Sequence, residues 1–274
     1  MGQSLYWSKL NAMSAFLHGK AILNTRAIHQ ATALDELLRG MGAIPIRYPC
    51  IEIVPPTDMA SLDRAVHDLL RGEFDWLVLT SANTVFALAE RLTQMGRTLA
   101  LVPFRIAVIG TATAQATYTH LQRVAEVCAP EQVAESLAQV LPIESGTRVL
   151  LPESALARPT LADQLLAKGA RVKVVTSYRT VCAQGGGHFP LAQLDAITFT
   201  SSSTVTCLVE RIHQAQSQQL TDVLGITVAC IGDKTSFTAR ECGFQHILTA
   251  QESSLVGLVD VLNRHFSSLV NRKE

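Results

Sequence analysis

The chain has 274 residues, of which 48% are hydrophobic and 17% are charged. That composition excludes a disordered polar chain, and the length suits two modest α/β domains or one large one. Lysine plus arginine and aspartate plus glutamate each number 23, so the net charge gives no reason to expect a nucleic acid or an anionic membrane as a partner. An anionic ligand would have to be held by local groups.

Strands and helices alternate along the chain. Short apolar runs at 21–24, 76–80 and 106–110 are typical of buried parallel strands. Apolar residues at helical spacing predict helices over 30–41 and 84–92. This alternation predicts an α/β fold with a parallel sheet covered by helices on both faces.

An internal repeat organises the sequence. Residues 74–92 and 194–212 are identical at eight of 19 positions when the chain is aligned with itself at an offset of 120. Two further pairs lie at offsets of 122 and 127: 106–116 with 228–238, and 19–43 with 146–170. The chain therefore consists of two tandem copies of a unit of about 120 residues.

Three segments have the composition of linkers, namely 54–61, 142–146 and 181–190. The glycine run Gly185–Gly187 predicts the most flexible point, where we expect hinging. It lies in the second repeat near the position that 54–61 occupies in the first. Linkers at matching places indicate that both repeats break there and cross between domains.

Four turns that follow predicted strands are small, rich in hydroxyl groups, and open helices. Their residues are Thr80, Ser81, Ala82 and Asn83; Gly110, Thr111, Ala112 and Thr113; Thr200, Ser201, Ser202 and Ser203; and Gly232, Asp233, Lys234 and Thr235. Such residues serve as helix N-caps, which is a sufficient reason for any one turn. Four turns at paired positions, at the strand ends where parallel sheets bind ligands, favour an anion-binding role as well.

Two further residues are candidates for a site. Tyr178 ends a predicted strand, and its phenol, protonated at neutral pH, could act as a general acid; the alternative is an aromatic residue packed at a strand end. Arg26 follows the first strand and could pair with a carboxylate, although a solvated or ion-paired arginine is the commoner case.

No pattern predicts a metal or a cofactor. The six cysteines, at 50, 128, 182, 207, 230 and 242, form no CxxC pair, and we expect free thiols in a reducing compartment. Histidine motifs of metal sites and glycine motifs of nucleotide sites are missing. Residues 1–18 read as an N-terminal extension without a signal peptide, and no apolar run is long enough to span a membrane, so we expect a cytoplasmic protein.

Several stretches together resemble one enzyme family. They are ILNTR (22–26), GAIPIRYPCIEI (42–53), FDWLVLTSANTV (74–85), the isoleucine-glycine turns after 108 and 230, SYRT (177–180), DAITFTSSSTV (195–205) and the segment 242–262. In this order they are similar to the uroporphyrinogen-III synthase family, over about residues 19–263.

The resemblance implies two flavodoxin-like domains joined by a two-stranded linker, with the active site in the interdomain cleft. One domain would comprise 1–46 with 183–274, and the other 53–175. The linkers would be 47–52 and 176–182.

The implied reaction converts hydroxymethylbilane, which bears eight carboxylates, to uroporphyrinogen III and water with inversion of ring D and without cofactor or metal. Tyr178 matches the family's tyrosine, which is thought to help protonate the leaving hydroxyl, and the four turns match its substrate-lining turns. Arg158 does not stand at the position of Arg26, so no role is carried over to it. We expect a monomer. The alternatives are a non-catalytic two-lobed binding or sensor protein and a nucleotide-dependent transferase.

Overall fold

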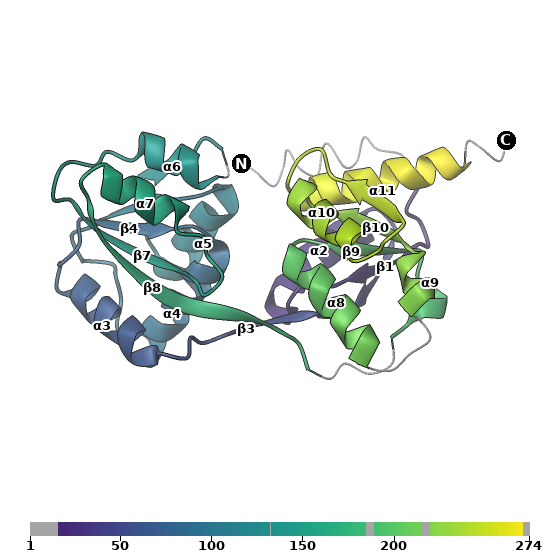
Figure 1. Ribbon diagram of the computed structural model, residues 1–274, viewed down its shortest axis with the longest axis horizontal. Helices are drawn as coiled ribbons and strands as arrows, with labels where there is room; N and C mark the ends of the chain where they lie inside the picture. The colour runs from purple at the N-terminus through teal and green to yellow at the C-terminus, as the bar shows by residue number, and fades with distance from the viewer. Residues whose placement is uncertain (1–15, 132, 185–188, 215–219, 271–274) are drawn as a thin grey trace. The chain divides into compact units, whose positions relative to one another are not determined.

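The computed structural model describes residues 16–131, 133–184, 189–214 and 220–270 (Figure 1). It divides into two compact units: unit 1 comprises Met1–Glu52 and Val181–Glu274, and unit 2 comprises Ile53–Thr180. The chain therefore leaves unit 1 after Glu52 and returns to it after Thr180. The glycine run at 185–187 and most of residues 1–18 lie outside the described residues.

Unit 1 contains a five-stranded sheet in the order β11-β10-β9-β1-β2, and all its strand pairs are parallel. The strands are β1 (Ala21–Asn24), β2 (Ile44–Arg47), β9 (Ala196–Phe199), β10 (Thr227–Cys230) and β11 (His246–Thr249). The helices are α2 (Ile28–Gly40), α8 (Ser202–Gln214), α9 (Leu220–Leu224), α10 (Asp233–Glu241) and α11 (Leu255–Val270), with a 3-10 turn at Leu191–Gln193.

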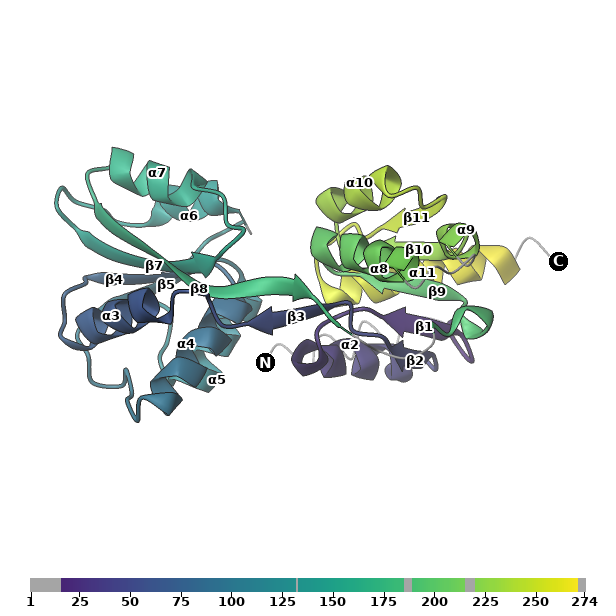
Figure 2. The same ribbon diagram turned by 60° about the horizontal axis from the view of Figure 1, so that its bottom comes forward.

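Helices cover both faces of this sheet. Leu34 and Leu38 of α2 pack with Leu258 and Leu262 of α11 on one face, and α8 and α10 lie over the other (Figure 2). The helix α2 ends where Gly42 adopts a left-handed φ of 76°, a conformation that suits glycine.

Unit 2 contains a six-stranded sheet in the order β3-β8-β7-β4-β5-β6. The strands are β3 (Ile51–Val54), β4 (Trp76–Leu79), β5 (Arg105–Val108), β6 (Val127–Cys128), β7 (Arg148–Ser154) and β8 (Arg171–Cys182). The helices are α3 (Met59–Leu70), α4 (Ala82–Gln94), α5 (Thr111–Leu121), α6 (Ala134–Val140) and α7 (Thr160–Ala167).

Two cores hold unit 2 together, one on each face of the sheet. Leu77 and Leu79 belong to the core under α3, α4 and α5, whereas Trp76 and Val78 belong to the core under α6 and α7. Because both faces are covered, every residue of β4 is buried, which explains its uninterrupted apolar sequence. The expected pattern of buried parallel strands is confirmed.

Each sheet combines strands from both repeats. The first repeat supplies β1 and β2 to unit 1 and β4, β5 and β6 to unit 2, and the second repeat supplies β7 and β8 to unit 2 and β9, β10 and β11 to unit 1. By repeat position the order is then the same in both units, 2-1-3-4-5, which is the flavodoxin-like order. Two parallel-sheet units of this kind confirm the predicted fold class.

One expectation from the sequence is wrong. Cys182 at the end of β8 and Cys207 on α8 form a disulfide, with their Cα atoms 5.1 Å apart. The prediction of free thiols fails because it relied on the absence of closely spaced cysteine pairs in the sequence. Cys182 and Cys207 are 25 residues apart, and they come together because the end of β8 reaches unit 1. Cys50, Cys128, Cys230 and Cys242 are free.

Candidate functional site

The four hydroxyl-rich turns lie at the carboxyl ends of central strands, which is where open parallel sheets bind ligands. In unit 2, Thr80, Ser81, Ala82 and Asn83 lead from β4 into α4, and Thr111, Ala112 and Thr113 open α5 after β5. In unit 1, Ser201, Ser202 and Ser203 lead from β9 into α8, and Asp233, Lys234 and Thr235 open α10 after β10. Within each unit the structure therefore brings two of the turns to one edge.

Two of these turns begin with a serine that caps its helix. Ser81 Oγ accepts a hydrogen bond from the backbone N–H of Thr84 at 3.2 Å, and Ser201 Oγ accepts one from Thr204 at 3.3 Å. Both threonines are completely buried. The capping interpretation of these serines is thus correct. Each serine accepts in its cap and can still donate its own proton, and Ser81 Oγ also lies 3.1 Å from Thr84 Oγ1.

The other two helices begin after a glycine. Gly110 precedes α5 and Gly232 precedes α10, and neither helix start has a side-chain capping hydrogen bond. Uncapped N–H groups at a helix start, with the positive end of the helix dipole, favour an anionic group. Each unit therefore combines one capped and one uncapped helix start at its carboxyl edge.

Tyr178 lies on β8 and is 7% exposed. Its hydroxyl oxygen is 3.2 Å from Ser81 Oγ, so either group can donate to the other. A shift in register after Glu153 pairs Ser154 of β7 with Tyr178. Tyr178 therefore lies near the carboxyl ends of the strands, where Ser81 follows β4. The structure thus joins two residues that the sequence proposed separately.

Arg26 follows β1 at the carboxyl edge of unit 1. Its guanidinium is half-buried, and one nitrogen donates to Gln30 Oε1 over a long 3.4 Å. Its Nε atom is buried without a hydrogen-bond partner among the described residues. Burial lowers the pKa of this side chain from its usual value. A guanidinium with an unmatched donor is suited to a carboxylate ligand.

Side-chain hydroxyls tie the two turns of unit 1 together. Ser202 Oγ donates to the carbonyl of Lys234 at 3.3 Å and accepts from Thr238 Oγ1 at 2.7 Å. The side chains of Asp233 and Lys234 are exposed. These contacts fix the backbone of both turns while leaving the charged ends accessible.

The sequence did not single out Glu153 as a site residue. It lies near the end of β7, is 7% exposed, and forms no hydrogen bond or ion pair through its side chain to any described residue. Burial raises the pKa of this carboxyl to about 7. A signal existed, because the repeat offset of 127 aligns Glu153 with Arg26.

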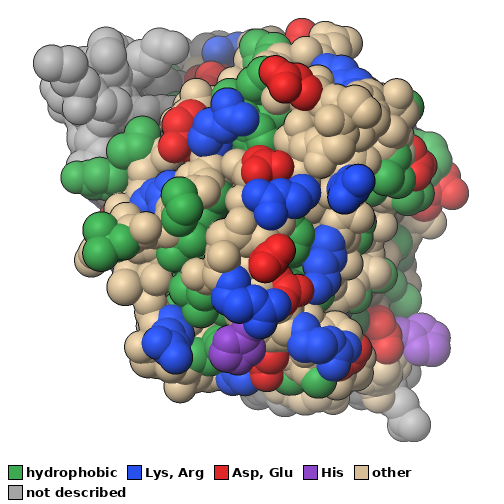
Figure 3. All heavy atoms as spheres, turned by 90° about the vertical axis from the view of Figure 1, so that its left-hand side faces the viewer, with side chains coloured by type: hydrophobic (Ala, Val, Ile, Leu, Met, Phe, Trp, Pro, Cys, Tyr) green, Lys and Arg blue, Asp and Glu red, His purple; other side chains and the backbone are tan. Residues whose placement is uncertain are grey.

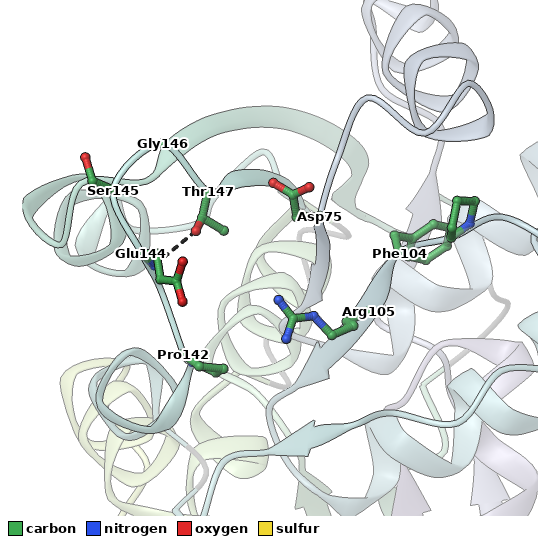
Figure 4. Close-up of a pocket in the computed structure, with 9 residues that line it drawn as sticks. Asp75, Phe104, Arg105, Pro142, Glu144, Ser145, Gly146 and Thr147 are labelled. Atoms are coloured by element: carbon green, nitrogen blue, oxygen red, sulfur yellow. Dashed lines mark hydrogen bonds between the residues drawn. The ribbon is translucent and has the colours of Figure 1, made fainter.

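A separate pocket of about 700 Å³ lies at the opposite, amino edge of the unit 2 sheet (Figure 4). Asp75 precedes β4 there, and Arg105 begins β5 with its guanidinium 4.2 Å from the ring centre of Trp76. Asp75 is bound by Arg148 at 2.7 Å, and the hydrogen bonds from Arg148 lower the pKa of Asp75. This pocket therefore lies at the opposite edge of the sheet from the two turns of unit 2, and its acidic and basic groups already in part form ion pairs with one another.

Charge of one sign does not gather on the face of unit 2 that Figure 3 shows. On the face of unit 2 in Figure 3, basic side chains are interleaved with acidic ones. Lys173 Nζ, for example, lies 2.7 Å from Asp68 Oδ2. In the described residues, no group of histidine, cysteine, aspartate and glutamate side chains could hold a metal ion. The helices of the same residues are too short or too polar to cross a membrane.

Comparisons with known proteins agree with one another. The family model for uroporphyrinogen-III synthase HemD matches residues 32–260. A uroporphyrinogen-III synthase of Synechococcus elongatus is 35% identical over 251 residues, which cover 89% of this chain and 94% of the relative. One of Salmonella typhimurium is 25% identical over 252 residues, covering 88% of this chain and 99% of the relative.

Solved structures support the fold. A mutant uroporphyrinogen III synthase from the extremely thermophilic bacterium Thermus thermophilus matches with a TM-score of 0.59 at 19% identity, covering 91% of this chain and all of the other. The enzyme from Helicobacter pylori matches with a TM-score of 0.54 at 17% identity, over 90% and 99% of the two chains. The family model spans most of the sequence, and the Synechococcus relative is similar over nearly its whole length. The chain belongs to the uroporphyrinogen-III synthase family.

Proposed function

We propose that the chain cyclises hydroxymethylbilane to uroporphyrinogen III and water, with inversion of ring D. Family membership supports this reaction, and the observation in the structure that supports it best is the hydrogen bond between Tyr178 and Ser81. This hydrogen bond lies at the carboxyl edge of unit 2, where α4 and α5 begin, and it supports a role for the phenol as proton donor.

In this proposal the phenol of Tyr178 donates a proton to the hydroxyl group that leaves the substrate as water. The phenol O–H is a possible donor, and Ser81 can hold its orientation through the 3.2 Å hydrogen bond. Departure of the hydroxyl leaves an electrophilic carbon, which the far pyrrole attacks through its substituted carbon. Migration of one bond of the resulting spiro centre inverts ring D.

The carboxylates of the substrate are assigned to the carboxyl edges of both sheets. The proposed binding residues are Arg26, Thr80, Ser81, Ala82, Asn83, Thr111, Ala112, Thr113, Ser201, Ser202, Ser203, Asp233, Lys234 and Thr235. Backbone N–H groups, hydroxyl groups and the unmatched Nε of Arg26 supply donors without a large net charge. Asp233 would contribute through its backbone, since its carboxylate would repel the substrate.

Control of the product is mainly a matter of positioning. The linear substrate also closes without enzyme, to the isomer in which ring D is not inverted. A 100-fold preference for one closure requires only about 2.7 kcal/mol between the two barriers, which positioning can supply. Neither a cofactor nor a metal is needed in this scheme. A monomer in the cytoplasm remains our prediction for the state in which the protein works.

The deciding experiment supplies freshly prepared hydroxymethylbilane to the purified protein and separates the oxidised porphyrins by chromatography. We expect mainly the type III isomer. Type I product in the ratio seen without protein would overturn the proposal, and reversible binding without turnover would favour the two-lobed binding protein instead.

A further inference from the structure

The inference concerns Glu153, the buried carboxyl group that the proposed mechanism leaves unused. Its strand β7 lies between β4 and β8 in the sheet of unit 2 (Figure 1). Glu153 is paired with Thr176 of β8. On its other side β7 pairs with β4, at Val149 with Trp76 and at Leu150 with Leu77. Glu153 therefore lies near the carboxyl end of β7, one row below the pair formed by Ser154 and Tyr178.

The alternation of side chains along β7 fixes the face on which Glu153 lies. Val149 and Leu151 belong to the core under α6 and α7, so Glu153, two residues further on, points to the same face. Ser154 and its neighbour Tyr178 then point to the other face. The two groups thus flank the same edge of one sheet from opposite sides.

The protein itself gives Glu153 no partner. Glu135 on α6, Asp163 on α7 and Arg158 just before α7 are charged residues on the elements over this face, and all three are exposed. In the described part of the chain none of them forms an ion pair with Glu153, and burial alone accounts for its raised pKa. The fully enclosed side-chain atoms without a partner in the described residues are Arg26 Nε and Trp76 Nε1, so the carboxyl oxygens of Glu153 reach the surface and are open to a ligand. An unpartnered carboxyl at a binding edge therefore indicates a ligand.

We propose that Glu153 binds one carboxylate of the substrate as the neutral acid, with its O–H donating a hydrogen bond to a carboxylate oxygen. This inference rests on the proposed function, because it requires a polycarboxylate at this edge. Two carboxyl groups in contact hold one proton between them, since the charge of one raises the pKa of the other. Binding of the substrate therefore takes up a proton from solvent when Glu153 is ionised.

The first test measures KM and kcat for hydroxymethylbilane from pH 6 to 9 with the wild type and with Glu153→Gln. For the wild type we expect KM to rise roughly 10-fold between pH 6.5 and 8.5, as the acid loses the proton that it donates. The glutamine variant keeps a donor at every pH, so its KM should stay nearly flat, with kcat changed less than about 3-fold, because Tyr178 carries the chemistry.

Two controls make the result specific. Glu144→Gln changes an exposed glutamate at the amino edge of the same sheet and should reproduce the wild-type pH profile. Glu153→Ala removes the donor and should raise KM at pH 6.5 by about 10-fold, the effect of one lost hydrogen bond to a charged group. Parallel pH profiles for the wild type and Glu153→Gln would overturn the inference.

A second measurement needs no variant. Calorimetric titration of the wild type with uroporphyrinogen III, kept reduced, in buffers of different ionisation enthalpy should show uptake of about half a proton at pH 7. No uptake would count against the inference. If type III product forms but neither the pH profile nor the proton uptake behaves as expected, the role of Glu153 fails and the proposed function stands. If no type III product forms, the proposed function itself fails.

Discussion

The two units share a scaffold but differ in the chemistry of their carboxyl edges. Ser81 in unit 2 and Ser201 in unit 1 cap equivalent helices. Each serine Oγ accepts a hydrogen bond from the backbone N–H of an equivalent buried threonine. Yet only Ser81 meets a phenol, because the residue that aligns with Tyr178 at the offset of 127 is Ile51. The two copies thus share the elements that fold each sheet, whereas the tyrosine that we propose as proton donor stands in one copy alone.

The first strand of each repeat shows a second contrast. The strand β1 is followed by Arg26, and β7 carries Glu153 at the aligned position. Burial lowers the pKa of Arg26 and raises that of Glu153, so both environments disfavour the charged form. The two repeats therefore carry residues of opposite sign at one equivalent position.

The largest effect is expected from removing the phenol that distinguishes unit 2. Tyr178→Phe should slow turnover by about 10- to 1,000-fold, at or below the usual range for a general acid, because the substrate also ionises unaided. Steady-state kinetics and the isomer ratio measure this. Tyr118→Phe, which changes an exposed tyrosine on α5 of the same unit, is the matched control. An unchanged rate and ratio in Tyr178→Phe would remove this residue from the mechanism.

The disulfide distinguishes unit 1, and reducing it should destabilise that unit alone. Cys182 and Cys207 are 25 residues apart in sequence, and opening a loop of that size lowers the free energy of unfolding by about 3 kcal/mol. Calorimetry with and without reductant, and with Cys182→Ser, measures the change. Unit 2 is followed by the fluorescence of the buried Trp76 in a Trp7→Phe background and should not respond. A shift of the unit 2 unfolding transition would contradict the expectation that the disulfide stabilises unit 1 alone.

Glu153 should make the stability of unit 2 depend on pH. Its pKa rises from 4.5 to about 7 on folding, so its neutral form stabilises the folded state below pH 4.5, and that contribution is lost as the pH rises through 7. The full shift would correspond to at most about 3 kcal/mol. Glu153→Gln should therefore gain about 2 kcal/mol relative to the wild type between pH 4.5 and 8. Denaturant unfolding followed by Trp76 fluorescence tests this, and a difference that does not vary with pH would show that the carboxyl is not buried in solution.

The smallest effect compares the two capping serines directly. Ser81→Ala and Ser201→Ala should each lower the stability of their own unit by about 1 kcal/mol, the usual value of an N-cap. Only Ser81→Ala should also reduce kcat, because it releases the phenol of Tyr178. Equal losses of kcat in the two variants would mean that the contact between Ser81 and Tyr178 has no part in turnover.

Local patterns were sufficient to predict much of the fold. The strands at 76–79 and 105–108 and the turns that follow them depend on short apolar runs and on small polar residues at helix starts. The repeat adds long-range information, because the paired linkers indicate where the chain crosses between domains. The strands and turns could be predicted because each depends on the residues within it or directly beside it.

The remaining features depend on contacts between distant residues. Ser81 and Tyr178 lie 97 positions apart, and Cys182 meets Cys207 only because β8 runs past its own unit. Glu153 shows the limit most clearly. Its sequence neighbours do not reveal that no partner reaches it, since that property belongs to the packed sheet and to the helices over it.

The exchange of strands between the repeats also bears on the order in which the chain folds during synthesis. Unit 2 is continuous from Ile53 to Thr180 and can form as soon as those residues leave the ribosome. In unit 1, by contrast, the backbone N–H of Ala21 is held by the carboxylate of Asp195, 174 positions later. The first two strands must therefore wait, with their apolar faces uncovered, until β9 emerges. A nascent chain halted when residue 180 has just left the ribosome should carry a folded unit 2 behind a segment that is still open to proteases and chaperones.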